Sequence, residues 1–161
     1  MIKRYITIAA MLLCLPVLAQ ANENKTHTSP IELMVYKTPT CGCCKKWISH
    51  IEDEGIIAYS KNFHNISPIK SKLGIKPNYR SCHTAVSKEG FVFEGHVPAK
   101  YIQQFLSEKH SNAIGLSVPA MPVGSPGMEV SDRFMPYNIL ILFNDGTSEV
   151  YHKVNSYEEQ F

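Results

Sequence analysis

The sequence predicts an α/β fold, because strand-like and helix-like segments alternate along the middle of the chain. An apolar run at 31–36 predicts a buried strand, and an apolar stripe in 42–54 predicts a helix directly after it. A second strand is expected at 56–60. Because crossovers of this kind are right-handed, we expect these two strands to be parallel neighbours in one sheet.

The predicted elements continue with a short helix, a hairpin and a second long helix. The short helix is expected to end at Leu73, directly before a glycine that favours a helix stop. Strand-like runs at 84–87 and 91–94 flank a Lys-Glu-Gly turn, which is typical of a hairpin. Pro98 then suits the first turn of a helix, and it predicts a helix over 99–109.

The last part of the chain, 110–161, is expected to form an extension packed on the same domain. It begins with a stretch rich in proline, glycine and methionine at 115–129, whose apolar content favours a compact loop over a flexible linker. An Asn-Asp-Gly turn between 139–143 and 148–152 predicts a final hairpin.

Three cysteines in four residues are the clearest chemical feature of the chain. Cys41, Cys43 and Cys44 follow the first predicted strand and open the first predicted helix. A helix N-terminus lowers the pKa of a thiol and favours the thiolate, which is both the nucleophile and the metal-binding form. A redox pair needs only two of these sulfurs, so the third indicates a soft metal.

The first residues predict export. Lys3 and Arg4 precede an apolar run that is too short to span a membrane, and an Ala-Gln-Ala sequence ending at residue 21 fits a cleavage site. We therefore expect a signal peptide over 1–21, a flexible segment over 22–30, and a periplasmic protein with no membrane insertion after cleavage. Without Lys3 and Arg4 the chain has 14 basic and 14 acidic residues, and this balance argues against a nucleic-acid partner.

Cleavage would remove Cys14 and leave four cysteines, the three of the first helix and Cys82. Four cysteines in an exported chain commonly form structural disulfides. The adjacency of Cys43 and Cys44 disfavours that arrangement, and a bridge from Cys41 to Cys44 would close a loop too small to stabilise the fold much. With 44% apolar residues, the chain can also form a core without disulfides.

The order of elements and the position of the cysteines resemble the thioredoxin fold over 31–109. That resemblance places Cys82 and His83 where thioredoxins carry the cis-proline segment that faces the cysteine motif. A thiol and an imidazole there would supply two ligands, and His96 at the end of the hairpin would lie on the same side of the sheet. A second register stays open, in which the last hairpin takes the place of the first one.

A more specific resemblance covers nearly the whole chain after residue 21. It rests on a loop at 118–129 and on three motifs, which are Cys41-Gly42-Cys43-Cys44, Ser81-Cys82-His83-Thr84-Ala85 and Glu94-Gly95-His96-Val97-Pro98-Ala99. In this loop and these three motifs, the chain resembles the CopG-type proteins of copper-resistance gene clusters. The resemblance implies a thioredoxin-like periplasmic copper-binding protein with a C-terminal extension. It also implies a role in copper redox chemistry and detoxification.

The candidate metal ligands are the thiols, imidazoles and thioethers of these segments. Sulfur ligands select Cu(I), whereas zinc also accepts cysteine and histidine. Three sulfurs crowded on one helical turn are better accommodated by thiolates that bridge several copper ions than by one tetrahedral zinc ion. We therefore expect copper, as Cu(I) or Cu(II) and with several ions per chain, and keep zinc as the alternative. The expected ligands are Cys41, Cys43, Cys44, Cys82 and His96, followed by His83, Met121 and Met128.

Four of these candidates also have an alternative interpretation. Cys43 would fit a small apolar position on the helix, and Met121 and Met128 would serve as core packing. Alternation along a strand would point the side chain of His83 away from that of Cys82. These alternatives stay open because they depend on side-chain directions that the sequence does not specify.

Two functions are compatible with the same residues. The first is a copper-binding protein that interconverts Cu(I) and Cu(II), which would be its enzymatic activity, or that passes copper to an efflux or chaperone protein. The second is a periplasmic thiol–disulfide oxidoreductase in which Cys41 attacks and Cys44 resolves. Cys43, Cys82 and His96 together favour the first, because disulfide exchange has no use for them. We expect a monomer in either case.

Overall fold

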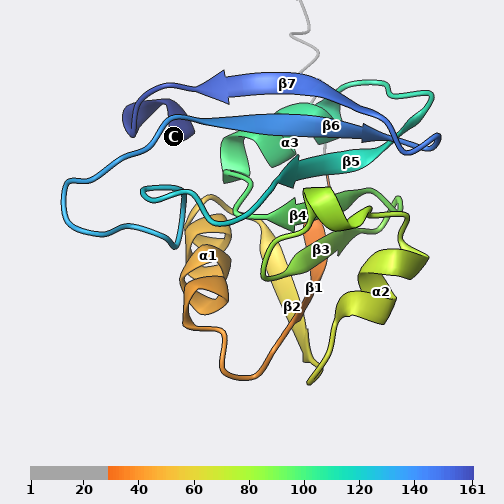
Figure 1. Cartoon of the computed structure of the whole chain (residues 1–161), viewed down its shortest axis with the longest axis horizontal. Helices are drawn as coiled ribbons and strands as arrows, with labels where there is room; N and C mark the ends of the chain where they lie inside the picture. The colour runs from red at the N-terminus through yellow and green to blue at the C-terminus, as the bar shows by residue number, and fades with distance from the viewer. Residues whose placement is uncertain (1–28) are drawn as a thin grey trace, which may run out of the picture.

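A mixed sheet of seven strands forms the body of the protein (Figure 1). The computed structural model describes residues 29–161, so the predicted signal peptide and most of the segment 22–30 lie outside it. Across the sheet the strands follow the order β2-β1-β3-β4-β5-β6-β7. The strands are β1 (Glu32–Lys37), β2 (Ile57–Asn62), β3 (Thr84–Ser87), β4 (Val92–Gly95), β5 (Ala113–Val118), β6 (Tyr137–Phe143) and β7 (Ser148–Val154). The helices are α1 (Gly42–Asp53), α2 (Ser67–Lys72) and α3 (Ala99–Ser107), with the 3-10 turns η1 (Pro77–Tyr79) and η2 (Glu158–Gln160).

The first four strands pair as the sequence predicts. β1 and β2 are parallel neighbours, with Glu32 opposite Ile57, which confirms the crossover through α1. β3 is antiparallel both to β1 and to β4, so the hairpin beside β1 is β3–β4. The alternative register, in which the last hairpin would occupy this place, is therefore wrong. The predicted α/β class is confirmed.

Helices cover both faces of this part of the sheet, and in Figure 1 the strands β1 to β4 run between α1 and α2. The larger core lies on the face of α1 and α3, where Trp47, Ile51 and Phe105 are fully buried against Phe93. A smaller cluster forms around Val92. Because neighbouring side chains on a strand point to opposite faces, Val92 and Phe93 place these two clusters on opposite sides of β4.

The prediction for the segment 113–118 is wrong, because the sequence analysis assigned most of it to a compact loop. It forms β5, parallel to β4, with Leu116 opposite Phe93. Gly115 weakens the strand pattern in the sequence, but a glycine is required here, because a Cβ atom would overlap the carbonyl oxygen of Val92. β5 therefore connects the C-terminal hairpin to the first four strands in one continuous sheet.

The predicted final hairpin is present as β6 and β7, with a register shift between Ile139 and Leu140. Between β5 and β6 the chain makes a long loop that returns to the first turn of α1. A Cβ atom on Gly127 of this loop would lie 2.7 Å from the carbonyl oxygen of Cys43 and from the amide nitrogen of Trp47. Within residues 29–161 we find no helix with the length and apolar character needed to cross a membrane.

Candidate metal centre

Four cysteine sulfurs converge at the N-terminal end of α1. The Sγ atom of Cys43 lies 3.5 Å from that of Cys41 and 3.7 Å from that of Cys82, and the Sγ atoms of Cys44 and Cys82 are 3.6 Å apart. Two thiolates bound to one ion at about 2.3 Å, with a tetrahedral angle between them, are about 3.8 Å apart. The measured separations therefore suit sulfurs that share metal ions of this size.

The local sequence places these sulfurs together. Cys41 is the N-cap of α1, and its Sγ atom accepts a hydrogen bond from the amide of Cys44 at 3.3 Å. The caps of helices normally use an oxygen for this purpose, so here the motif itself supplies the cap. Cys44 is fully buried, whereas Cys41 and Cys43 are half-buried.

Cys41 and Cys44 are joined by a disulfide, while Cys43 and Cys82 are free thiols. The sequence analysis argued against structural disulfides, and this bond is present nonetheless. It spans a sequence separation of three residues, so it restricts the unfolded chain very little. The bond therefore adds little to the stability of the fold. Reducing it makes all four thiols available as ligands.

A second group of donors shares Cys82 with the first. The Sγ atom of Cys82 lies 3.1 Å from Nε2 of His96 and 3.3 Å from Nδ1 of His83. Cys82 and His83 directly precede β3 and His96 directly follows β4, so the antiparallel pairing of these strands places the three side chains together. Both groups have their donor atoms within 4.8 Å of one another and are suitable for holding a metal ion.

The orientation of His96 is set by the loop between β5 and β6. Its Nδ1 atom lies 2.7 Å from the carbonyl oxygen of Pro126. Because a carbonyl only accepts, Nδ1 carries the proton and Nε2 presents a lone pair to Cys82. Histidine ligands of metals typically donate their other ring N–H in this way. The contact was not predicted from the sequence, since it depends on how the loop folds back.

The position directly before His96 requires a glycine, Gly95. Its φ angle is 74°, and a Cβ atom there would lie 2.5 Å from the carbonyl oxygen of Val118 and 2.6 Å from Cβ of Ser81. Any side chain would therefore separate β4 from β5 and from the segment that carries Cys82.

His83 is completely buried between two rings. Its imidazole packs on Trp47 with ring centroids 4.3 Å apart and meets His96 edge-on at 5.0 Å. Burial holds the pKa of His83 well below its ordinary value, and the nearby His96 adds to this effect. Burial likewise lowers the pKa of His96. Both imidazoles are therefore neutral at pH 7, as metal binding requires, and Nε2 of His83 has no hydrogen-bond partner among residues 29–161.

The Cys82 thiol is protonated when no metal is bound. Burial raises its pKa to about 12, and the neighbouring Cys43 thiol contributes to the shift. The effect of a helix N-terminus on the motif cysteines thus does not extend to Cys82, which lies on another segment. A metal ion that binds Cys82 must displace this proton.

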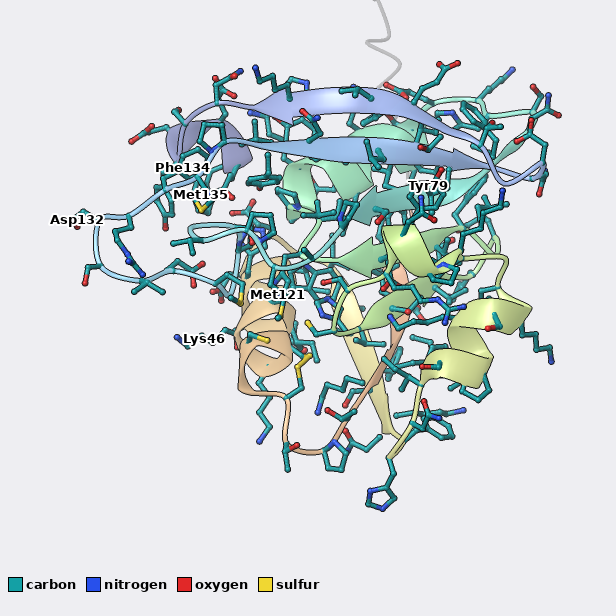
Figure 2. All side chains as sticks on the ribbon, viewed as in Figure 1. Lys46, Tyr79, Met121, Asp132, Phe134 and Met135 are labelled. Atoms are coloured by element: carbon teal, nitrogen blue, oxygen red, sulfur yellow. A yellow bond between two sulfur atoms is a disulfide. The ribbon has the colours of Figure 1, made fainter. Side chains whose placement is uncertain are left out.

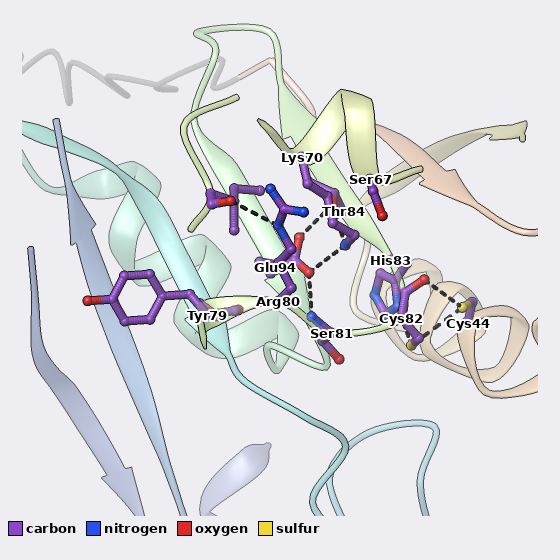
Figure 3. Close-up of polar contacts among 12 residues, drawn as sticks. Cys44, Ser67, Lys70, Tyr79, Arg80, Ser81, Cys82, His83, Thr84 and Glu94 are labelled. Carbon is purple, nitrogen blue, oxygen red and sulfur yellow. Dashed lines mark hydrogen bonds and ion pairs between the residues drawn. The ribbon is translucent and has the colours of Figure 1, made fainter. Parts of the chain in front are cut away.

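A buried ion pair fixes the segment that carries Cys82 and His83 (Figure 3). The carboxylate of Glu94 contacts the ammonium of Lys70 at 2.5 Å, and Lys70 also donates to Oγ1 of Thr84 at 2.9 Å. The same carboxylate accepts from the amide of Ser81 at 2.6 Å and from the hydroxyl of Thr84 at 2.5 Å. The Glu94 side chain therefore holds the residues on both sides of Cys82-His83, through the backbone of Ser81 and the side chain of Thr84.

This network was missed in the sequence analysis, although Glu94 was quoted as part of a motif. Both charged side chains are almost inaccessible, with Lys70 3% and Glu94 0% exposed. Burial lowers the pKa of Lys70 and raises that of Glu94, and in each case the charge of the partner opposes the shift. Buried lysines are rare, so nothing in the sequence around Lys70 indicates its role.

The candidate methionines lie in the long loop. Met121 is 47% exposed, Met128 is half-buried, and neither is core packing. Met128 directly follows Gly127, which contacts the first turn of α1, so Met128 is the better placed of the two as a candidate metal ligand. Figure 2 shows Met121 and, at the outer edge of the loop, Asp132.

Comparison with known proteins identifies the family. Two solved structures, described as forms 1 and 2 of the copper resistance protein CopG, are each 38% identical to this chain. Each match covers 78% of this chain and 98% of the other, with TM-scores of 0.73 for form 2 and 0.72 for form 1. The chain belongs to the CopG family.

A further match has no stated function. The family model described as "Protein of unknown function, DUF411" matches residues 79–128. That segment contains Cys82, His83 and His96 and ends at Met128, but it excludes the three cysteines of α1. No curated protein matches the chain. The family relationship therefore rests on the two CopG structures, and it confirms the resemblance found in the sequence.

Proposed function

We propose that this protein binds copper through the thiolates of Cys41, Cys43, Cys44 and Cys82 and the imidazole of His96. In this proposal copper is the cargo and substrate of the protein rather than a resident cofactor. The observation that supports this best is the arrangement around Cys82, where thiols of α1 lie on one side and a histidine with a fixed tautomer on the other. The mixed sulfur and nitrogen donors make both Cu(I) and Cu(II) acceptable.

His83, Met128 and Met121 are proposed as additional ligands, in that order. His83 has a ring nitrogen 3.3 Å from the Cys82 sulfur, whereas the evidence for the methionines is only their place in the loop. Four thiols and the imidazole of His96 are five donors, more than one tetrahedral ion takes, which supports bridging thiolates and more than one copper ion per chain. Copper is favoured over zinc because sulfur predominates among these donors.

The physiological role that we propose is copper resistance by interconversion of Cu(I) and Cu(II) or by transfer of copper to a periplasmic efflux or chaperone protein. The relationship to CopG, whose name describes copper resistance, supports this role. A cleaved signal peptide over 1–21, a periplasmic location and a monomeric state belong to the same proposal. They rest on the pattern of the first residues and on the charge balance of the chain.

We further propose that 31–109 has the thioredoxin-like fold and that 110–161 extends it. The strand order β2-β1-β3-β4, with β3 antiparallel to its neighbours, supports the first assignment. The second is supported by β5, β6 and β7, which continue the sheet beyond β4.

A titration with Cu(I) tests the proposal. The reduced protein, handled without air, should saturate above one equivalent against a competing chelator, and Cys82→Ser should lower the number of bound ions. His64 is an exposed histidine outside the site, so His64→Ala serves as the control and should bind as the unmodified protein does. Saturation at one equivalent that Cys82→Ser leaves unchanged would exclude a shared multi-copper site.

The disulfide between Cys41 and Cys44 favours a second candidate function, thiol–disulfide exchange. A variant of His96 distinguishes copper binding from thiol–disulfide exchange, because an imidazole at this position has no part in exchange between Cys41 and Cys44. We expect His96→Ala to sensitise cells to copper and to leave any insulin-reducing activity unchanged. Full copper tolerance of His96→Ala, with reductase activity lost in Cys41→Ser, would favour the oxidoreductase.

A further inference from the structure

The four sulfurs of the site form a closed ring in which each sulfur of the disulfide contacts one free thiol. Cys41 lies 3.5 Å from Cys43, Cys44 lies 3.6 Å from Cys82, and the two free thiols are 3.7 Å apart. A metal ion on either free thiol is therefore next to a sulfur of the redox pair, with no intervening group.

Oxidation of the pair leaves a usable set of donors. When Cys41 and Cys44 are bonded to each other, Cys43, Cys82 and His96 still offer two thiols and one imidazole, with the Cys82 sulfur 3.7 Å from that of Cys43 and 3.1 Å from Nε2 of His96. Soft donors of this kind retain Cu(I). The site is thus able to give up two electrons and still bind the reduced ion.

We propose that the dithiol of Cys41 and Cys44 is the electron source that reduces Cu(II) in this protein. This inference rests on the copper-binding function proposed above. Two Cu(II) ions each gain one electron, the two sulfurs form their S–S bond, and the two thiol protons are released to solvent. The Cu(I) produced is held by Cys43, Cys82 and His96.

The exposure of the pair indicates how it is reset. Cys44 is fully buried, whereas Cys41 is half-buried at the end of the helix. An external dithiol would attack the sulfur of Cys41 and leave as a disulfide, which returns both electrons and both protons to the pair. The disulfide thus joins a buried sulfur next to Cys82, that of Cys44, to a more accessible sulfur, that of Cys41.

Single-turnover reduction of Cu(II) tests the inference. The fully reduced protein is mixed without air with excess Cu(II) as its glycine complex, and the loss of the Cu(II) electron paramagnetic resonance signal is followed. We expect two Cu(II) ions to be reduced per chain in the fast phase and two thiols to be lost, with peptide mapping placing the new bond between Cys41 and Cys44. In Cys44→Ser the initial rate should fall about tenfold or more, because the neighbouring partner sulfur is missing.

His64→Ala is the control variant and should behave as the unmodified protein. A Cu(II) signal that shows no fast loss, or a new bond that maps to Cys43 and Cys82 or between chains, would overturn the inference. Unchanged fast reduction in Cys44→Ser would overturn it as well. Direct titration with Cu(I) keeps the underlying function separate: failure to bind Cu(I) contradicts copper binding, whereas Cu(I) binding without reduction of Cu(II) contradicts only the electron source.

Discussion

Removing the carboxylate of Glu94 should destabilise both the fold and the copper site. In Glu94→Ala the ammonium of Lys70 loses its partner in a place where it is only 3% exposed, and the amide of Ser81 loses its acceptor. Breaking a buried pair in this way typically costs about 3–5 kcal/mol. Lys70 can also release its proton, which removes the unpaired charge. For a group with an ordinary pKa of 10.5, deprotonation at pH 7 costs about 5 kcal/mol, and this cost sets the upper limit of the loss in stability from the unpaired charge.

Urea denaturation of the metal-free protein measures this cost. Glu94→Gln keeps an oxygen for the Ser81 amide but not the charge, so its cost should be smaller, about 2–3 kcal/mol. Adding Lys70→Met to Glu94→Gln removes the uncompensated charge and should bring the free energy of unfolding to within about 1 kcal/mol of the original. A cost below about 1 kcal/mol for Glu94→Ala, or a double variant no more stable than Glu94→Gln, would refute the reasoning.

Three further predictions concern pH, the loop and export. Burial lowers the pKa of His83 below the 6.5 of the unfolded chain, so the stability from its neutral form is complete above pH 6.5 and is lost as the pH falls; the free energy of unfolding should fall by up to about 1.4 kcal/mol per pH unit for this proton. His83→Phe should remove that part of the slope, and an unchanged slope would disprove the assignment. Gly127→Ala should cost about 1–3 kcal/mol and release His96 from Pro126, because φ is 86° and a Cβ would press on α1; Gly42→Ala, with free space around it, is the control in thermal melts and copper titrations. Mass spectrometry of the exported protein should show a chain starting near Asn22, and an intact Met1 would remove the argument for a periplasmic location.

Sequence patterns predict the elements that have local causes. The apolar stripe of α1 and the Asn-Asp-Gly turn of the last hairpin are short-range patterns, and both structures are present where expected. β5 was missed because Gly115 and Ser117 interrupt its apolar pattern, while its pairing with β4 depends on a close backbone approach at Val92. Such an approach is a tertiary property with no local pattern of its own.

The same distinction applies to the candidate site. Cys41, Cys43 and Cys44 are recognisable from spacing alone, and Cys82 joins them once the strand order is known. The carbonyl of Pro126 that orients His96, and the burial of Lys70 beside Glu94, depend on long-range packing. Whether the motif cysteines form a disulfide stayed open in the sequence, because a bond from Cys41 to Cys44 closes a loop too small to add much stability.

Copper K-edge X-ray absorption of the Cu(I)-loaded protein tests the central claim most directly. The arrangement of four thiols and His96 predicts a first shell dominated by sulfur, with a contribution from nitrogen and a copper–copper scattering path from bridging thiolates. His96→Ala should reduce the nitrogen contribution and keep the sulfur shell. A first shell of nitrogen and oxygen alone, or a spectrum that Cys82→Ser leaves unchanged, would contradict the account.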